Sequence, residues 1–305
     1  MVASPPKKSK KRVLVLWALL IVMFLTIWQF LTPAERVVSS VDQPVPPIAE
    51  TSPFWSSTVI ALLPLGLVVL LAFLFLRAYR AVHHFNHAQE AGRMALAHRR
   101  FGEAVELFRA TIPRFAKQPA YRAAATLNVA EAQLKACRLD DALASCAEIE
   151  RPRLLLLGSS IRTRIATLSA FVYALKGNGA LAERWLTDAR LRLTKNHEDR
   201  IGQAGYLCLA EATLACRAGD HGAALRLLDE RWLELRYAIS ADAMRTVEVV
   251  RAFAEAQAGI RAMNTVAERL VRIEPVTKGE LAFLGVEWPE MKAFLAAHGL
   301  EASPG

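Results

Sequence analysis

Two long apolar runs without any charged residue lie near the start of the chain, at residues 13–31 and 54–76. They contain 19 and 23 residues. A helix of about 20 residues crosses the roughly 30 Å of hydrocarbon in a bilayer, because it satisfies its own backbone polar groups. The pattern therefore predicts two transmembrane helices, at residues 13–32 and 54–76.

A cleaved secretory signal is the alternative for the first run, because a basic stretch, residues 7–12, precedes it. The apolar part of a signal usually has about 7–15 residues and is followed by small residues at cleavage spacing. The first run is longer, no such site follows it, and a second full-length run comes soon after. We therefore expect an uncleaved anchor.

The basic residues beside the two runs predict the topology. Five Lys and Arg residues precede the first run, and Arg77 and Arg80 follow the second, whereas the connecting stretch contains Arg36 alone. Because Lys and Arg near a span stay on the cytoplasmic side, we expect a cytoplasmic tail at 1–12 and a Pro-rich extracytoplasmic loop at 33–53. Everything from residue 77 onward is then cytoplasmic, which suits the inner membrane of a bacterium.

Beyond residue 84 the chain is rich in Ala, Leu, Arg and Glu, which predicts helices throughout. Breaks recur at Gly102, residues 138–140, residues 177–179, residues 219–222 and Gly259. A small residue follows each break by a few positions: Ala104, Ala142, Ala182 and Ala224, with Asn264 as a weaker fifth match. Successive members of this set are 38, 40, 42 and 40 residues apart. Regular breaks of this kind indicate stacked helical hairpins.

Around these positions the chain resembles the tetratricopeptide repeat, a hairpin motif with small residues in both helices and a large residue before the turn. The residues that carry the resemblance are Gly92, Phe101, Ala104 and Phe108; Ala130, Leu139, Ala142 and Cys146; Ala170, Tyr173, Ala182, Leu186 and Ala189; Ala212, Ala215, Ala224 and Leu228. The periods exceed the 34 residues of the family, and no unit has its Trp and Pro together. The resemblance implies an all-α solenoid over residues 77–274, with a helical cap and tail at 275–305.

Composition and motifs give little sign of catalytic chemistry. The chain has no phosphate loop, HExxH, GxSxG or paired CxxC motif, so we expect neither enzymatic activity nor a cofactor. The four cysteines fit small core positions in a reducing compartment. His83 and His87 lie one helical turn apart and are the only metal-ligand candidates, with a solvated run of polar residues as the alternative.

The resemblance also implies a groove lined by the first helix of each repeat. The family's groove positions map here to Asn86, Gln89, Arg93, Glu131, Lys135, Arg164, Phe171, Tyr206, Arg217 and Phe253. Basic and aromatic side chains together suit an extended peptide that carries carboxylates. We therefore expect a protein partner, with an acidic peptide segment as its docking element.

These expectations combine into one hypothesis, a membrane-anchored adaptor that binds proteins at the cytoplasmic face. One alternative is an accessory subunit of a membrane enzyme system, similar in architecture to the membrane-bound tetratricopeptide protein associated with haem biosynthesis. A membrane-tethered nucleic-acid-binding regulator is a weaker alternative, because the positive charge of residues 77–305 is spread over many helices. The sequence leaves the partner, the pathway and the oligomeric state open.

Overall fold

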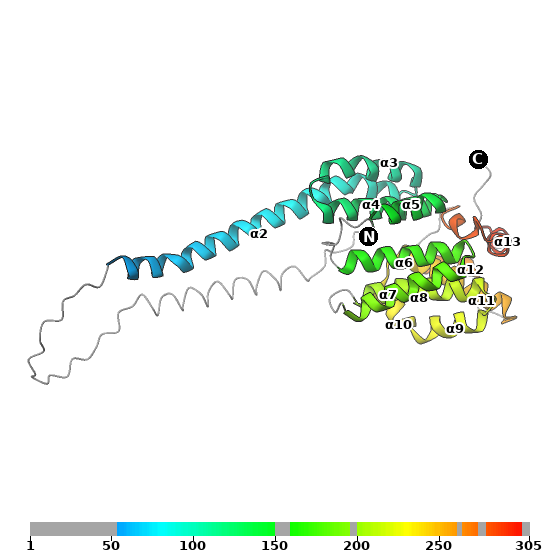
Figure 1. Cartoon of the computed structure of the whole chain (residues 1–305). Coiled ribbons are helices and arrows are strands. Elements are labelled where there is room, and N and C mark those ends of the chain that lie inside the picture. The colour runs from blue at the N-terminus through cyan, green and yellow to red at the C-terminus, as the bar shows by residue number, and fades with distance from the viewer. Residues whose placement is uncertain (1–53, 150–158, 196–199, 261–263, 274–278, 301–305) are drawn as a thin grey trace, which may run out of the picture. The chain divides into compact units, whose positions relative to one another are not determined.

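The computed structural model of the protein describes residues 54–149, 159–195, 200–260, 264–273 and 279–300 (Figure 1). Throughout these ranges the secondary structure is helical, and no strand occurs in them. The chain divides into two units, residues 1–81 and 82–305. The predicted first span at 13–32 and the loop at 33–53 lie outside the described residues.

Helix α2, Phe54–Ala97, is one unbroken helix that contains the second apolar run (Figure 1). Its large apolar side chains from Leu67 to Leu76 are exposed apart from the half-buried Val68, as expected of a helix that faces lipid rather than a protein core. Gly66–Ala97 is the one helix in the described part of the chain that is long and apolar enough to cross a membrane.

The described parts of residues 82–305 form five helical hairpins. Their helices are the end of α2 with α3 (Phe101–Thr111), α4 (Pro119–Lys135) with α5 (Leu139–Ile149), α6 (Ser159–Leu175) with α7 (Gly179–Lys195), α8 (Arg200–Arg217) with α9 (His221–Glu230), and α11 (Ala241–Gln257) with α12 (Val266–Val271). Two short helices, η1 (Ile112–Phe115) and α10 (Trp232–Ala238), lie in the connections. The first helices pack in succession, α4 on α6, α6 on α8 and α8 on α11.

The turn inside each hairpin has the same backbone geometry in all five. Each contains one residue with positive φ, and these residues are Arg99, Cys137, Gly177, Gly219 and Gly259. In each turn the N–H of the next residue donates to the carbonyl five positions back, as in Asn178 to Tyr173, at 2.8–2.9 Å. This pattern is a Schellman motif, and its spacing of 38, 40, 42 and 40 residues confirms the repeat register read from the sequence.

Sequence chemistry accounts for most of these turns but misplaces the first. Gly adopts positive φ without a Cβ penalty, and Asn178 and Asp220 then cap the following helix through their side chains. The predicted first break at Gly102 is wrong, because Gly102 lies within α3 and the turn falls at Arg99. A non-glycine residue occupies the left-handed position there, and the sequence therefore gives no glycine signal.

Gly219→Ala is expected to destabilise the fold by about 1–2 kcal/mol, because φ at this position is +83° and an L-residue is strained there. No atom lies within 4 Å of the added Cβ, so the effect reports the backbone alone. Gly102→Ala is the matched control, since its Cβ also meets open space but within a helix. Urea unfolding followed by circular dichroism should show the control unchanged or up to about 1 kcal/mol more stable. Equal midpoints for the two variants would contradict the turn assignment.

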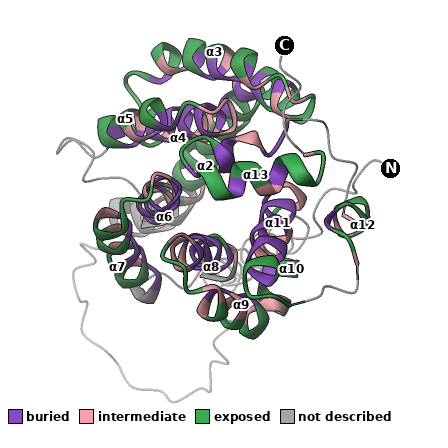
Figure 2. Cartoon of the chain, turned by 90° about the vertical axis from the view of Figure 1, so that its right-hand side faces the viewer, coloured by how far each residue is buried: buried purple, intermediate pink, exposed green. Residues whose placement is uncertain are grey.

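Small residues allow the helices of a hairpin to approach closely. Ala104, Ala142, Ala182 and Ala224 are fully buried. At Gly92 a Cβ would lie 2.4 Å from the ring of Phe108, so only glycine permits this contact between α2 and α3. Figure 2 shows buried residues on the sides of the helices that face one another, with α3, α5, α7 and α9 outside α4, α6 and α8. We call the face formed by the first helices, α2, α4, α6, α8 and α11, the inner face.

Residues 279–300, here called the C-terminal segment, consist of η3 (Ala282–Gly285) and α13 (Pro289–Ala297). The sequence predicts that this region covers the end of the last hairpin. In the structure it reaches much further, because its side chains contact residues at the ends of α2, α4, α6 and α8 as well as α11. The C-terminal segment therefore lies along the inner face and connects all five hairpins.

Candidate partner-binding surface

A row of basic residues marks the C-terminal ends of the first four inner-face helices. Lys135 and Arg217 are the last residues of α4 and α8, Lys176 directly follows α6, and Arg99 lies two residues beyond α2. A cation at this end of a helix is stabilised by the helix dipole and the free carbonyl groups. Because the five hairpins stack in register, the basic residues of successive repeats form one row on the inner face.

At one end of the row lies a buried ionic cluster. Arg245 and Glu280 form an ion pair with side chains 0% and 1% exposed, and Arg245 also pairs with Asp242. Nε of Arg99 lies 3.0 Å from Glu280 Oε2, and Nη1 of Arg99 lies 3.0 Å from Asp242 Oδ1. The cluster joins the first hairpin, the fifth hairpin and the C-terminal segment. Since buried charges require compensation, each partner depends on the others.

Lys135 adds a third cation beside this cluster. Its Nζ lies 3.7 Å from Asp242 Oδ2 and 4.4 Å from the ring centre of Phe283 in the C-terminal segment. Burial lowers the pKa of Lys135, and the nearby Asp242 and Glu280 carboxylates offset only part of that effect. The contact with the aromatic face compensates some of the lost hydration.

Further along the row, the C-terminal segment supplies two more carboxylates. Nζ of Lys176 lies 2.5 Å from Glu287 Oε1, a hydrogen bond that raises the pKa of Lys176. Arg217 donates from Nη2 to the Glu287 carbonyl at 2.8 Å, and its Nη1 lies 3.3 Å from Glu290 Oε2. The Arg217 guanidinium also lies over the Trp288 ring, at 5.4 Å. Charged residues of the hairpins therefore pair with charged residues of the C-terminal segment.

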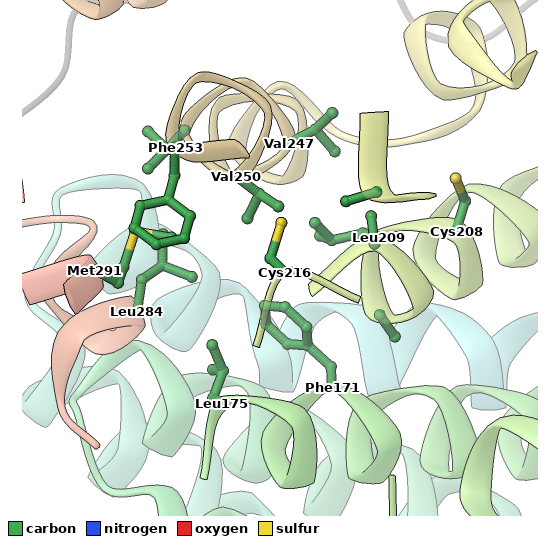
Figure 3. Packing of buried hydrophobic residues seen from close by; sticks show 14 of the residues in the cluster. Phe171, Leu175, Cys208, Leu209, Cys216, Val247, Val250, Phe253, Leu284 and Met291 are labelled. Carbon is green, nitrogen blue, oxygen red and sulfur yellow. The ribbon is translucent and has the colours of Figure 1, made fainter. Parts of the chain in front are cut away.

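Aromatic rings supply the apolar part of the contact. The centre of the Phe253 ring lies 5.0 Å from that of Trp288 and 5.5 Å from that of Phe294, both edge-on. Phe171 meets Phe283 in the same manner at 6.4 Å. Figure 3 shows Phe253 beside Met291 and Leu284, within the core cluster that also contains Phe171. Edge-to-face packing of this kind adds to the stabilisation from burial.

Four of the residues assigned to the groove from the sequence are therefore covered. Lys135, Phe171, Arg217 and Phe253 all contact the C-terminal segment. These four residues contact acidic and aromatic side chains of the same chain and do not form an open surface. The structure places these four residues on one face, and the sequence mapping did not anticipate that the C-terminal segment covers them.

Gln89 is also not a surface residue. Its side chain is fully buried, donates to Thr111 Oγ1 at 2.5 Å and accepts from Asn128 Nδ2 at 3.0 Å. These bonds link α2 to α3 and α4. Gln89 therefore satisfies a structural hydrogen-bond network between the first two hairpins.

The remaining predicted groove residues are wholly or partly exposed. Arg93 donates to Asn86 at 3.2 Å on α2, Arg164 of α6 pairs with Glu131 of α4, and Tyr206 of α8 donates to Ser240 Oγ at 3.3 Å. Side-chain exposure is 39% for Arg164 and 40% for Glu131. We call Asn86, Arg93, Glu131, Arg164 and Tyr206 the open residues.

Sequence reasoning missed the residues that anchor the C-terminal segment, namely Arg99, Asp242, Arg245, Glu280 and Trp288. One available signal was the recurrence of a basic residue at the end of the first four inner-face helices, together with three glutamates in residues 280–290. The sequence does not show which basic residue pairs with which glutamate. The partners lie up to 181 positions apart in the chain, as Arg99 and Glu280 do, and no repeating spacing connects them.

The remaining candidates from the sequence are the two histidines and the cysteines. His83 and His87 are exposed, and within the described ranges no group of three or more His, Cys, Asp and Glu side chains is placed to hold a metal ion. Burial raises the pKa of Cys208 and of Cys216 to about 12. A thiol with such a pKa is unreactive near neutral pH, which fits a packing role for both cysteines.

Comparison with protein-family models, curated proteins and solved structures found no match to this chain.

Proposed function

We propose that this protein is a membrane-anchored scaffold of the tetratricopeptide-like class that binds partner proteins at the cytoplasmic face. The observation that carries the proposal is that the inner face binds a polypeptide segment through carboxylates and aromatic rings, with the chain's own residues 279–300 as the bound segment. Helical repeats use such faces as binding surfaces, and a short helix lying on a groove is a known mode of peptide recognition. The open residues continue this face and remain accessible.

The membrane anchor is supported by two features. Helix α2 is long and apolar enough to cross a bilayer, and it continues without a break into the first hairpin. The residues around the two apolar runs favour a cytoplasmic location for residues 77–305. In this proposal the first span at 13–32 completes a two-helix anchor.

The experiment is affinity capture of the full-length protein from crosslinked membranes, with captured proteins identified by mass spectrometry. Arg93→Ala/Arg164→Ala removes two open basic residues without touching the C-terminal segment. Arg109→Ala/Arg184→Ala removes the same charge from the exposed sides of α3 and α7 and is the matched control. We expect a defined set of proteins with the wild type and the control, and at least a tenfold loss for the first variant.

Equal capture by both variants would overturn the assignment of the inner face as the binding surface. Capture of no defined protein by the wild type would count against the scaffold function itself. Urea unfolding of all three proteins should give equal midpoints, since exposed ion pairs contribute roughly 0–1 kcal/mol. If the midpoints are equal, a loss of captured proteins reflects a loss of binding and not unfolding of the variant.

A further inference from the structure

The C-terminal segment is attached to the inner face by its side chains. Within the described residues, every backbone–backbone hydrogen bond of residues 279–300 is made inside the segment itself. Its helix α13 ends in its own Schellman turn, with Gly299 at φ +69° and the Leu300 N–H donating to the Leu295 carbonyl at 2.9 Å. The segment is thus a small helical element whose backbone–backbone hydrogen bonds are internal, and it docks as a separate ligand would.

Its docking chemistry has a clear pattern along the basic row. Glu280 meets Arg99 and Arg245, Glu287 meets Lys176, and Glu290 meets Arg217. Between the last two carboxylates lies Trp288, which is 2% exposed and packs between Arg217 and Phe253. Along the chain, a carboxylate is followed by an aromatic residue and, two residues later, by a second carboxylate. Each of the three side chains has a partner on the inner face.

The two ends of the segment differ in how deeply they are held. Glu280 is 1% exposed and pairs with the fully buried Arg245, whereas Glu287 and Glu290 pair at the surface, with Glu290 64% exposed. Ion pairs at such exposure contribute roughly 0–1 kcal/mol each. The part from Glu287 onward is therefore held mainly by Trp288, Met291, Phe294 and Leu295, and competition at the Trp288 site acts on this part first.

We infer that the C-terminal segment is a tethered ligand of the inner face, and that the partner is a protein that carries the same element: a tryptophan or similar aromatic residue between two carboxylates at the start of a short helix. This inference rests on the proposed function, for which it names the partner chemistry. The partner segment takes the place of residues 287–297, and the open residues beside it contact the flanking parts of the partner. Because the segment belongs to the same chain, a partner has to compete with it for the inner face. Only a partner segment of matching chemistry binds tightly enough to displace it.

The test uses the full-length protein in lipid nanodiscs and a fluorescent peptide with the sequence of residues 279–300. Trp288→Ala/Glu290→Ala in the protein weakens its own docked segment, and fluorescence anisotropy then measures peptide binding. We expect the peptide to bind this variant at least about tenfold more tightly than the wild type, because the site is vacant more often. A control peptide with Trp288→Ala and Glu290→Gln should not bind, and Arg217→Ala in the variant protein should weaken binding of the unmodified peptide.

Absence of peptide binding to a variant that keeps its helical circular dichroism and cooperative melting would overturn the inference, as would equal binding of both peptides. Should the variant fail to fold, hydrogen exchange of the wild-type protein decides. A tethered ligand predicts that amides of α13 exchange at least about tenfold faster than the most protected amides of α8, through an opening confined to the segment. Equal rates would make the segment a permanent part of the core.

The two proposals fail separately. If the peptide binds but the Arg93→Ala/Arg164→Ala variant captures the same proteins as the wild type, the tethered ligand stands and the open residues are not the partner surface. If capture depends on the open residues but the peptide does not bind, the scaffold function stands and the segment is structural.

Discussion

Replacing Glu280 by alanine is expected to destabilise residues 82–305 by about 3–5 kcal/mol. The change removes the buried carboxylate that pairs with the Arg245 guanidinium, which is 0% exposed, and it also removes the 3.0 Å contact with Arg99. Arg245 keeps the partly exposed Asp242, but a buried charge that loses its buried partner is far more costly than the loss of an exposed ion pair. Urea unfolding followed by tryptophan fluorescence should show a large drop in the midpoint.

Two further variants separate burial of charge from general loss of packing. Glu148→Ala removes a carboxylate that lies 2.9 Å from Arg122 but is 45% exposed, and it should change stability by less than about 1 kcal/mol. Arg245→Met/Glu280→Met removes both buried charges and replaces them with apolar side chains. It should be more stable than Glu280→Ala, and a double variant that is less stable than Glu280→Ala would refute the electrostatic explanation.

Phe253→Ala is expected to destabilise the same unit by about 3–5 kcal/mol, the range observed for loss of a fully buried aromatic side chain. Phe253 is 2% exposed and contacts Trp288 and Phe294 in the C-terminal segment. Its removal leaves a cavity where α11 meets α13. Thermal unfolding should show a fall of roughly 6–20 °C in the midpoint, since about 2–4 °C corresponds to 1 kcal/mol in a unit of this size.

Tyr237→Ala is the control for this substitution, because it also removes an aromatic ring but from a side chain that is 82% exposed. Its effect should stay within about 0.5 kcal/mol. A similar loss for the two variants would indicate that Phe253 is not part of a packed core. A Phe253→Ala protein that melts like the wild type would show that the C-terminal segment does not pack on α11.

Together these contacts divide the inner face by role. Lys135, Phe171, Arg217 and Phe253 hold the C-terminal segment, so their replacement affects stability as well as any binding. Arg93 is exposed and Arg164 is partly exposed, so both can be changed with little effect on the fold. A search for partners therefore has to begin with the open residues, where a change in binding is not confounded with unfolding.

The sequence by itself determined the helical class, the apolar run within α2 and the register of the five hairpins. These are local properties, because helix propensity, an uninterrupted apolar run and a glycine with φ near +75° each act within a few residues. Turns at Gly177, Gly219 and Gly259 were accordingly predicted. The turn at Arg99 was misplaced because a non-glycine residue fills the left-handed position, and no residue type marks it.

Only the tertiary structure decided what the inner face contacts. The sequence predicted Lys135 and Arg217 in a groove for an acidic peptide of a partner protein, but not that Glu280, Glu287 and Glu290 of the same chain contact the inner face. Ion pairs and ring contacts between residues far apart in the chain leave no periodic trace in the sequence. They form because the stacked hairpins bring the ends of α2, α4, α6, α8 and α11 to one face, where the C-terminal segment meets all five.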